Sequence, residues 1–136
     1  MKIQTFADAT RLSVHALRHY EAMGLLVPAR LSNGWRDYAP AQVREGVFIA
    51  MSRDVGFSLA AIAQVLPLYR QGGLSVADMV EMLEKQQKVV DEQIATLSAQ
   101  RQKLIDHAQW LNRQASGAPN RGSSRKPWPA SRKKQR

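Results

Sequence analysis

The chain has 136 residues, which suffice for one compact domain with appendages but are too few for two full hydrophobic cores. Its formal net charge is +9 and favours a polyanionic partner, but residues 1–114 hold thirteen basic against eleven acidic side chains, whereas residues 115–136 hold seven basic and no acidic ones. The sequence contains no cysteine, which excludes disulfides, thiolate metal ligands and thiol redox sensing.

A first helix of about two turns is expected near the start of the chain. Thr5 and Asp8 form a possible capping pair for this helix. Its buried side would carry three apolar residues, Ile3, Phe6 and Ala9. The pair Arg11-Leu12 would then form the turn of a helix-turn-helix.

A second helix of about three turns is framed by a favoured N-cap residue, Ser13, and by Gly24, which suits the left-handed residue that closes a helix. Its back is apolar, with Val14, Leu17 and the following Leu25. Its front carries donor-rich side chains, His15, Arg18 and His19. Such a face can enter a DNA groove, but on this helix alone an ordinary solvated face is the better explanation, because amphipathic helices are common.

A β-hairpin is expected directly after this helix. Two short extended runs, 26–31 and 35–38, flank Ser32-Asn33-Gly34, and Asn-Gly is the strongest short-range hairpin signal because both residues tolerate positive φ. Arg30 and Arg36 lie on the two arms, where they could straddle a phosphate backbone.

Two further helices are expected after the hairpin. The third runs from Pro40 to about Val55 and ends at Gly56, and the fourth runs from its cap, Ser58, to Leu66, because Pro67 marks a boundary. The expected buried side of the third helix is Val43, Val47, Phe48 and Met51. Arg53 is a candidate phosphate contact; the alternative is a solvated side chain paired with Asp54 or Glu45.

The clearest periodic signal begins after a glycine-containing linker. Residues 75–114 carry a heptad repeat in which nine of eleven seam positions are apolar, and Gln87 and Arg101 interrupt it. The apolar seam residues are Val76, Val80, Leu83, Val90, Ile94, Leu97, Leu104, Ala108 and Leu111. The repeat predicts a coiled coil with the same helix of a second chain; the alternative is a long helix folded back on its own domain.

Residues 115–136 have too little apolar content to fold, so we expect a disordered basic tail that adds phosphate affinity or merely increases solubility. The start of the chain lacks the pattern of a secretion signal, and no apolar run approaches membrane-spanning length, so a cytoplasmic protein is expected.

Three linked motifs in residues 1–66 resemble the amino-terminal half of the MerR family of bacterial transcription regulators. They are L-R-H-Y-E-A-M-G-L, N-G-W-R-D-Y and G-F-S-L, in the family's order and near its spacing. The family usually carries glycine where Arg11 stands, and a left-handed conformation at an arginine costs about 1 to 2 kcal/mol.

The resemblance implies a mainly α fold that begins with a winged helix-turn-helix and a short hairpin wing at 1–67. The sequence patterns described above add a linker at 68–74, a dimerisation helix at 75–114 and the tail at 115–136. A dimer would place two recognition helices on one duplex, which predicts a pseudo-palindromic site. The resemblance further implies that such a homodimer distorts an overlong promoter spacer, with RNA polymerase at the same promoter. The residues that would lie at the DNA are Ser13, His15, Arg18, His19, Tyr20, Arg30, Trp35, Arg36, Tyr38 and Arg53. In this set, Arg18 and Tyr20 would contact phosphates, His15 and Arg18 would approach base edges, and Trp35 and Tyr38 would brace the hairpin.

Two other functions are consistent with the sequence: an architectural protein that bends DNA, and a coiled-coil adaptor whose basic tail meets RNA, acidic proteins or lipid. His15 and His19 are one helical turn apart, but no third metal ligand lies near them in the sequence, so neither a metal nor another cofactor is expected. No nucleophile with an adjacent base and no phosphate-binding loop is present, and an enzyme is not expected.

Overall fold

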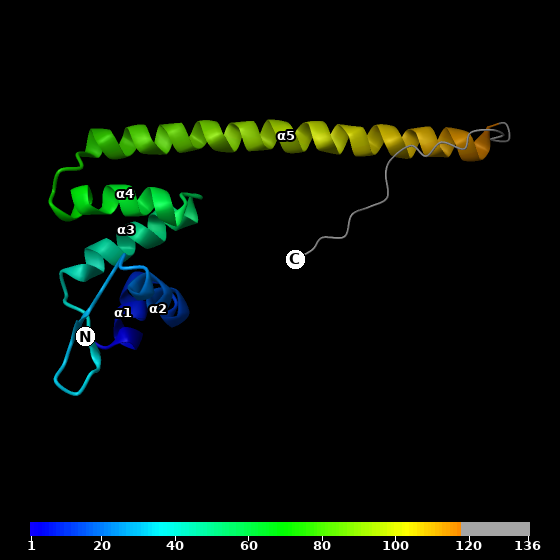
Figure 1. Ribbon diagram of the computed structural model, residues 1–136. Helices are drawn as coiled ribbons and strands as arrows, with labels where there is room; N and C mark the ends of the chain where they lie inside the picture. Colours follow the sequence, from blue (N-terminus) through cyan, green and yellow to red (C-terminus); the bar gives the residue numbers. More distant parts are fainter. Residues whose placement is uncertain (118–136) are drawn as a thin grey trace. The chain divides into compact units, whose positions relative to one another are not determined.

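Helices dominate the computed structural model of this protein, in which residues 1–117 are described (Figure 1). In chain order the elements are α1 (Ile3–Thr10), α2 (Val14–Ala22), β1 (Ala29–Arg30), β2 (Arg36–Asp37), α3 (Gln42–Asp54), α4 (Leu59–Arg70) and α5 (Val76–Ser116). They form two units, Met1–Gln87 and the residues from Lys88 onward. Among residues 1–117, no helix has the length and apolar character needed to cross a bilayer.

The first helix starts earlier than expected. Its N-cap is Lys2, with no side-chain capping bond, so the expected Thr5 and Asp8 cap is wrong; Asp8 instead accepts a hydrogen bond from the Gln4 amide at 3.3 Å. The earlier start also changes which side faces inward. Phe6, Ala7 and Thr10 are buried, while Ala9, expected in the core, is exposed.

The helix-turn-helix is closed by a left-handed arginine. Arg11 has φ 64° and ψ 24°, and its N–H donates to the Ala7 carbonyl at 2.8 Å, so the turn carries the backbone cost that glycine would avoid. The hydroxyl of Ser13 accepts a hydrogen bond from the Ala16 N–H at 2.9 Å, which confirms it as the N-cap of α2. Gly24, with φ 76°, follows the end of α2 as expected.

The hairpin is present but its paired strands are short. β1 and β2 pair antiparallel, with Ala29 opposite Asp37 and Arg30 opposite Arg36. The tip takes the expected form, because Gly34 has φ 88° and the Asn33 side-chain oxygen accepts the Trp35 N–H at 3.0 Å. Two residues per strand hold a hairpin weakly, so other contacts must fix its position.

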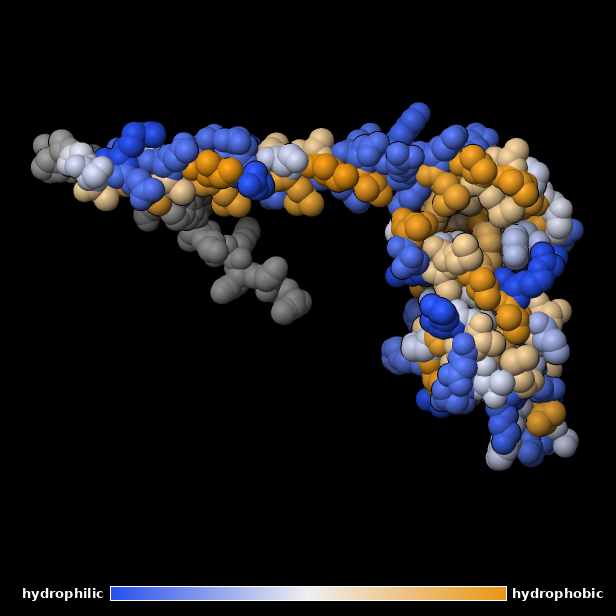
Figure 2. Space-filling view, turned by 180° about the vertical axis from the view of Figure 1, so that it is seen from behind, coloured by the Kyte–Doolittle hydropathy of each residue, from blue (hydrophilic) through white to orange (hydrophobic). Residues whose placement is uncertain are grey.

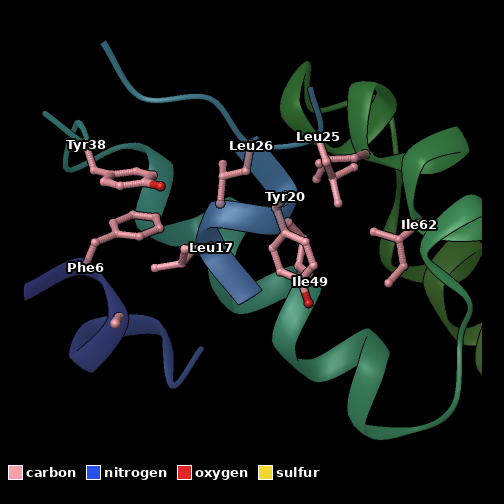
Figure 3. Close-up of a cluster of buried hydrophobic side chains, with 10 residues drawn as sticks. Phe6, Leu17, Tyr20, Leu25, Leu26, Tyr38, Ile49 and Ile62 are labelled. Carbon is pink, nitrogen blue, oxygen red and sulfur yellow. The ribbon is translucent and has the colours of Figure 1, made fainter. Parts of the chain in front are cut away.

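The core lies where α1, α2, the hairpin, α3 and α4 meet (Figure 3). The ring of Phe6 stacks on that of Tyr38, with centroids 4.1 Å apart and planes 10° from parallel. The largest fully buried side chains are Tyr38, Phe6, Leu17, Leu26, Ile49, Ile62, Leu66 and Thr10. This packing holds the second helix and the hairpin on one framework.

The buried side of α3 differs from the sequence expectation. Gly46 and Ile49 are its buried residues, whereas Met51 is 66% exposed and the other three expected residues are only partly covered. The reason is close helix packing: a Cβ on Gly46 would lie 2.5 Å from the Thr10 Cγ2 atom of α1. The missing side chain lets α1 approach and turns this side of α3 inward.

The fourth helix continues through Pro67 to Arg70, so its expected end at Leu66 is wrong. Its last turn is held by contacts with α3. The ring of Tyr69 stacks on Phe48 with centroids 4.2 Å apart, and the Arg70 guanidinium donates to the Glu45 carboxylate at 2.7 Å. These tertiary contacts offset the missing N–H of proline near a helix end.

The long helix α5 has the expected start. The Ser75 hydroxyl accepts the Asp78 N–H at 3.0 Å, and the Asp78 carboxylate accepts the Ser75 N–H at 3.1 Å, which is a reciprocal capping box. The helix spans 41 residues, or about 60 Å at 1.5 Å per residue. The expected basic tail lies, apart from residues 115–117, outside the described residues.

One carboxylate ties the hairpin to α2. Glu21 Oε2 accepts a hydrogen bond from Arg30 Nη2 at 2.7 Å, and Glu21 Oε1 accepts one from Arg36 Nε. The Glu21 side chain is only 17% exposed. Its pKa is lowered, chiefly by the hydrogen bond from Arg36 against the opposing effect of burial, with a further contribution from Arg30.

We predict that Glu21→Gln lowers the free energy of unfolding at neutral pH by about 1 to 2 kcal/mol, because charge-assisted hydrogen bonds are lost. The pKa of Glu21 is below its ordinary value of 4.5 in the folded protein. The stabilisation is therefore complete above about pH 4.5 and disappears as the pH falls through the folded-state pKa. Chemical denaturation at a series of pH values should show the wild type and the variant converging in acid.

The control is Glu84→Gln, because Glu84 is exposed on α5. It should leave the free energy of unfolding nearly unchanged at every pH. A difference between wild type and Glu21→Gln that stays constant down to pH 2 would contradict the ionised bridge.

We predict that Gly46→Ala destabilises the fold by about 1 to 3 kcal/mol through overpacking, although alanine gains about 1 kcal/mol of helix propensity. Thr10→Ser removes the closest atom, the Thr10 Cγ2 methyl, while keeping the hydroxyl that donates to the Phe6 carbonyl. Thermal unfolding of the double-mutant cycle should show partial recovery. An equal effect of Thr10→Ser in both backgrounds would refute the proposed clash.

Candidate nucleic-acid interface

The outward face of α2 carries the three expected side chains. His15, Arg18 and His19 are all exposed. Within residues 1–117, neither a hydrogen bond nor an ion pair engages the Arg18 guanidinium, so its N–H groups are available to a ligand. Ser13 lies at the N-terminus of the same helix, where its hydroxyl serves as the cap. The front of α2 is thus solvated in the free protein and rich in donors.

Two tyrosines of the predicted DNA-binding set lie in the core instead. Tyr20 is 6% exposed and Tyr38 is 0% exposed. Among the described residues, the Tyr38 hydroxyl is the buried side-chain atom that has no hydrogen-bond partner, and burial raises the pKa of this phenol. The buried position of Tyr38 is consistent with the bracing role expected for it, whereas Tyr20, expected at a phosphate, has little exposed surface to offer. Both rings belong to the buried hydrophobic cluster, in which the Tyr38 ring lies against Phe6 (Figure 3).

The hairpin presents two paired arginines and an exposed indole. Arg30 and Arg36 share Glu21, and Arg30 Nη1 also donates to the Gly34 carbonyl at 2.8 Å. Arginine has five N–H donors, so each guanidinium keeps donors for a phosphate oxygen. Trp35 is 57% exposed. The pairing fixes where these arginines lie and reduces their local excess charge by one unit.

Lys2 and Glu21 were not among the residues predicted for this surface. The Lys2 ammonium lies 5.2 Å from the centroid of the Trp35 ring, at a hollow of about 220 Å³. The hollow is lined by Lys2, Ile3, Arg30, Gly34, Trp35 and Arg36. Lys2 and the hairpin are far apart in sequence, so sequence periodicity could not predict the contact between Lys2 and Trp35. For Glu21, the two nearby arginines on the hairpin arms are the signal in the sequence that could have indicated its role.

Arg53 lies at the end of α3 and pairs with neither of its expected partners. Its Nη1 donates to the Phe57 carbonyl at 2.8 Å. Glu45 is instead bonded to Arg70. The Arg53 side chain therefore closes the turn between α3 and α4 and keeps its remaining donors exposed to solvent.

The predicted dimerisation seam of α5 is uncovered in the single chain. α5 has no buried residue, and the exposed fractions along the seam run from 37% for Val90 to 73% for Val76. Figure 2 shows hydrophobic residues recurring along this helix between hydrophilic ones. All nine apolar seam residues named from the heptad repeat, including Ala108, are exposed. A repeated apolar stripe of this length is typical of a coiled-coil helix.

Residues 1–117 contain no cluster of three or more histidine, aspartate or glutamate side chains placed to hold a metal ion. His15 and His19 thus lie on the donor-rich face of α2 without an acidic third ligand beside them.

Family models match most of the chain. Residues 1–68 match the MerR HTH family regulatory protein model, and residues 47–107 match the MerR DNA-binding model. The two matches together cover the helix-turn-helix, the hairpin, the α3–α4 pair and most of α5.

Curated relatives match over comparable lengths. The HTH-type transcriptional regulator HmrR of Rhizobium leguminosarum bv. viciae is 33% identical over 104 residues, which cover 76% of this chain and 81% of HmrR. A probable heavy metal-dependent transcriptional regulator of Haemophilus influenzae is 36% identical over 105 residues, covering 76% of this chain and 82% of that protein.

Solved structures share the fold. A MerR-family regulator from Bacillus cereus superposes with a TM-score of 0.67 at 19% identity, over 87% of each chain. PbrR691 from Ralstonia metallidurans CH34, solved with lead(II), has a TM-score of 0.65 at 25% identity, over 80% of this chain and 86% of that one. The chain therefore belongs to the MerR family of helix-turn-helix, DNA-binding transcriptional regulators.

Proposed function

We propose that this regulator acts as a homodimer on a pseudo-palindromic promoter site and distorts an overlong promoter spacer. The observation that carries the proposal is the combination of an exposed, donor-rich α2 with an exposed apolar seam on α5. The first feature can contact one half-site, and the second can join two such units.

The second copy of this chain is the partner that best fits α5. The seam extends along about 60 Å of helix, and a matching length of apolar helix is needed to cover it. Within residues 1–117, the other helices have at most 13 residues. The same seam on another chain has the required length and spacing, which supports a homodimer over a fold-back arrangement.

The DNA contacts divide into base and phosphate contacts. We assign base edges to His15, Arg18 and His19, because histidine and arginine donors on a short exposed helix can reach the major groove. We assign phosphates to Arg30, Arg36 and Arg53, with Trp35 beside them on the hairpin. Ser13 and the N-terminal N–H groups of α2 lie at the end that can face a phosphate. Tyr20 and Tyr38 are buried and contribute by packing that holds α2 and the hairpin in place.

Promoter distortion rests on family likeness. The cryo-EM structure of the EcmrR–DNA complex in EcmrR-RPo has a TM-score of 0.57 at 25% identity and covers 85% of this chain and 40% of that one. The proposed partners are accordingly double-stranded DNA and RNA polymerase at the same promoter. A rival function, an architectural or adaptor protein that uses the basic tail, would need neither site preference nor α2.

A footprint on the protein's own upstream region and on genomic fragments, near physiological salt, tests the proposal. A protected palindrome between widely spaced promoter elements supports it, whereas protection without sequence preference favours the architectural rival. Truncation after Gln114 separates the adaptor from the regulator, because the regulator keeps its site preference while losing part of its affinity.

Arg18→Ala should weaken binding to the selected site by about 10- to 100-fold, because a bidentate base contact discriminates by about 1 to 3 kcal/mol. The affinity of the variant for nonspecific DNA should fall much less. The measurement is fluorescence anisotropy on both duplexes at fixed salt. Arg113→Ala, on exposed helix α5, is the matched control for one lost positive charge. Equal losses on both duplexes would show that α2 does not read bases.

Replacing Val90 and Ile94 with lysine should give monomers at concentrations where the wild type is dimeric, because burying unpaired ammonium groups in the seam costs several kcal/mol. Analytical ultracentrifugation measures the result. The control replaces Ala95 and Ala99 with lysine, which adds the same charge outside the seam and should leave the dimer intact. If the seam variant remained dimeric, the interface would lie elsewhere.

A further inference from the structure

Gln86 joins the first turns of α5 to the turn between α3 and α4. Its side-chain Nε2 donates a hydrogen bond of 3.0 Å to the carbonyl oxygen of Val55. Val55 is the C-cap residue of α3, and the carbonyls at a helix C-terminus have no partner within their own helix. The Gln86 amide supplies that partner from α5.

The turn is shaped to receive this amide. Gly56 follows Val55 with φ 94°, a left-handed conformation that suits glycine. A Cβ at Gly56 would lie 2.9 Å from Gln86 Nε2, so a side chain there would crowd the amide. The glycine thus both ends α3 and leaves room for Gln86. Arg53 closes the other side of the same turn by its bond to Phe57.

Within Met1–Gln87, this is the one side-chain hydrogen bond between α5 and the preceding helices. The other side-chain bonds of α5 in this unit are local, namely the Ser75–Asp78 cap and the Glu81–Lys85 pair. Met79, Met82 and Gln86 are partly buried and lie three and four residues apart, so they form one stripe of the helix. The seam residues of the same turns are exposed. The first turns of α5 therefore have one side toward their own unit and a different side available to a second copy.

We propose that Gln86 is a positioning residue that sets the half-site spacing this regulator accepts. The inference rests on the proposed homodimer. In such a dimer, the separation of the two recognition helices depends on how firmly each α3–α4 turn is held against its own α5. One added base pair moves a half-site by about 3.4 Å and rotates it by about 35°, since B-DNA has 10 to 10.5 base pairs per turn. A firmly held unit cannot follow that movement without losing contacts, whereas a loosely held one can.

The test uses full-length protein and Gln86→Glu, which keeps the side-chain size but replaces the donor with an acceptor facing the Val55 carbonyl. Gln100→Glu is the matched control, because it makes the same charge change at an exposed position of α5. The probe is the duplex site selected by the wild-type protein, together with versions that have one base pair added or removed at the centre. Each protein's affinities are divided by its affinity for the original spacing, so a general effect of the added negative charge cancels.

We expect wild type and Gln100→Glu to lose about tenfold in affinity per base-pair change, within the range usual for coupled sites. Gln86→Glu should lose clearly less affinity than this per base-pair change, and it should bind more weakly at the original spacing. The same spacing profile for Gln86→Glu and wild type, both binding as dimers, overturns the inference and leaves the proposed function standing. A wild-type protein that recognises only a single half-site overturns the proposed dimer and this inference with it.

A second measurement needs no variant. In the wild-type protein, one of the two side-chain amide protons of Gln86 should exchange with solvent more slowly than those of Gln100, because it is hydrogen-bonded to the Val55 carbonyl. Nuclear magnetic resonance resolves the two amides. Equal exchange rates would show that the link to Val55 is not maintained in solution and would overturn the inference.

Discussion

The proposed DNA-binding surface depends on the bridge from Glu21 to Arg30 and Arg36. The two paired strands have only two residues each, so main-chain hydrogen bonding cannot fix the hairpin by itself. The carboxylate near the end of α2 binds one arginine from each strand and is itself largely covered. Partial burial strengthens these charge-assisted bonds and limits screening by salt. The second helix and the hairpin are consequently held as one surface.

The same bridge separates two kinds of arginine. Arg30 and Arg36 are already oriented in the free protein, so less side-chain freedom is lost when a phosphate binds to their remaining donors. Arg18 has no such partner within residues 1–117 and can adapt to base edges. This division suits the proposed roles, because phosphate contacts fix the register of a protein on DNA and base contacts provide specificity.

Two different sides of the long helix α5 have different roles. Its apolar seam is available for a second copy, while Gln86 and the partly buried methionines of its first turns lie toward their own unit. The relative from Haemophilus influenzae is named as heavy metal-dependent, and PbrR691 was solved with lead(II). This sequence, in contrast, has no cysteine to provide thiolate ligands.

Local sequence determined much of the architecture. The Ser13 cap, the Asn33-Gly34 tip and the heptad repeat of α5 were predictable, because each depends on residues within a few turns of one another. The exposed face of α2, with His15, Arg18 and His19, followed from the same periodicity.

Tertiary structure decided the features that join distant parts of the chain. Sequence periodicity placed Met51 in the core, but the approach of α1 to Gly46 turned α3 differently. Pro67 suggested a helix end, yet contacts of Tyr69 and Arg70 with α3 carry α4 further. The partners of Glu21 and Gln86, like the burial of Tyr38, also depend on residues far apart in sequence. Local propensity is a weak preference of about 1 kcal/mol or less per residue, and packing and buried polar contacts override it.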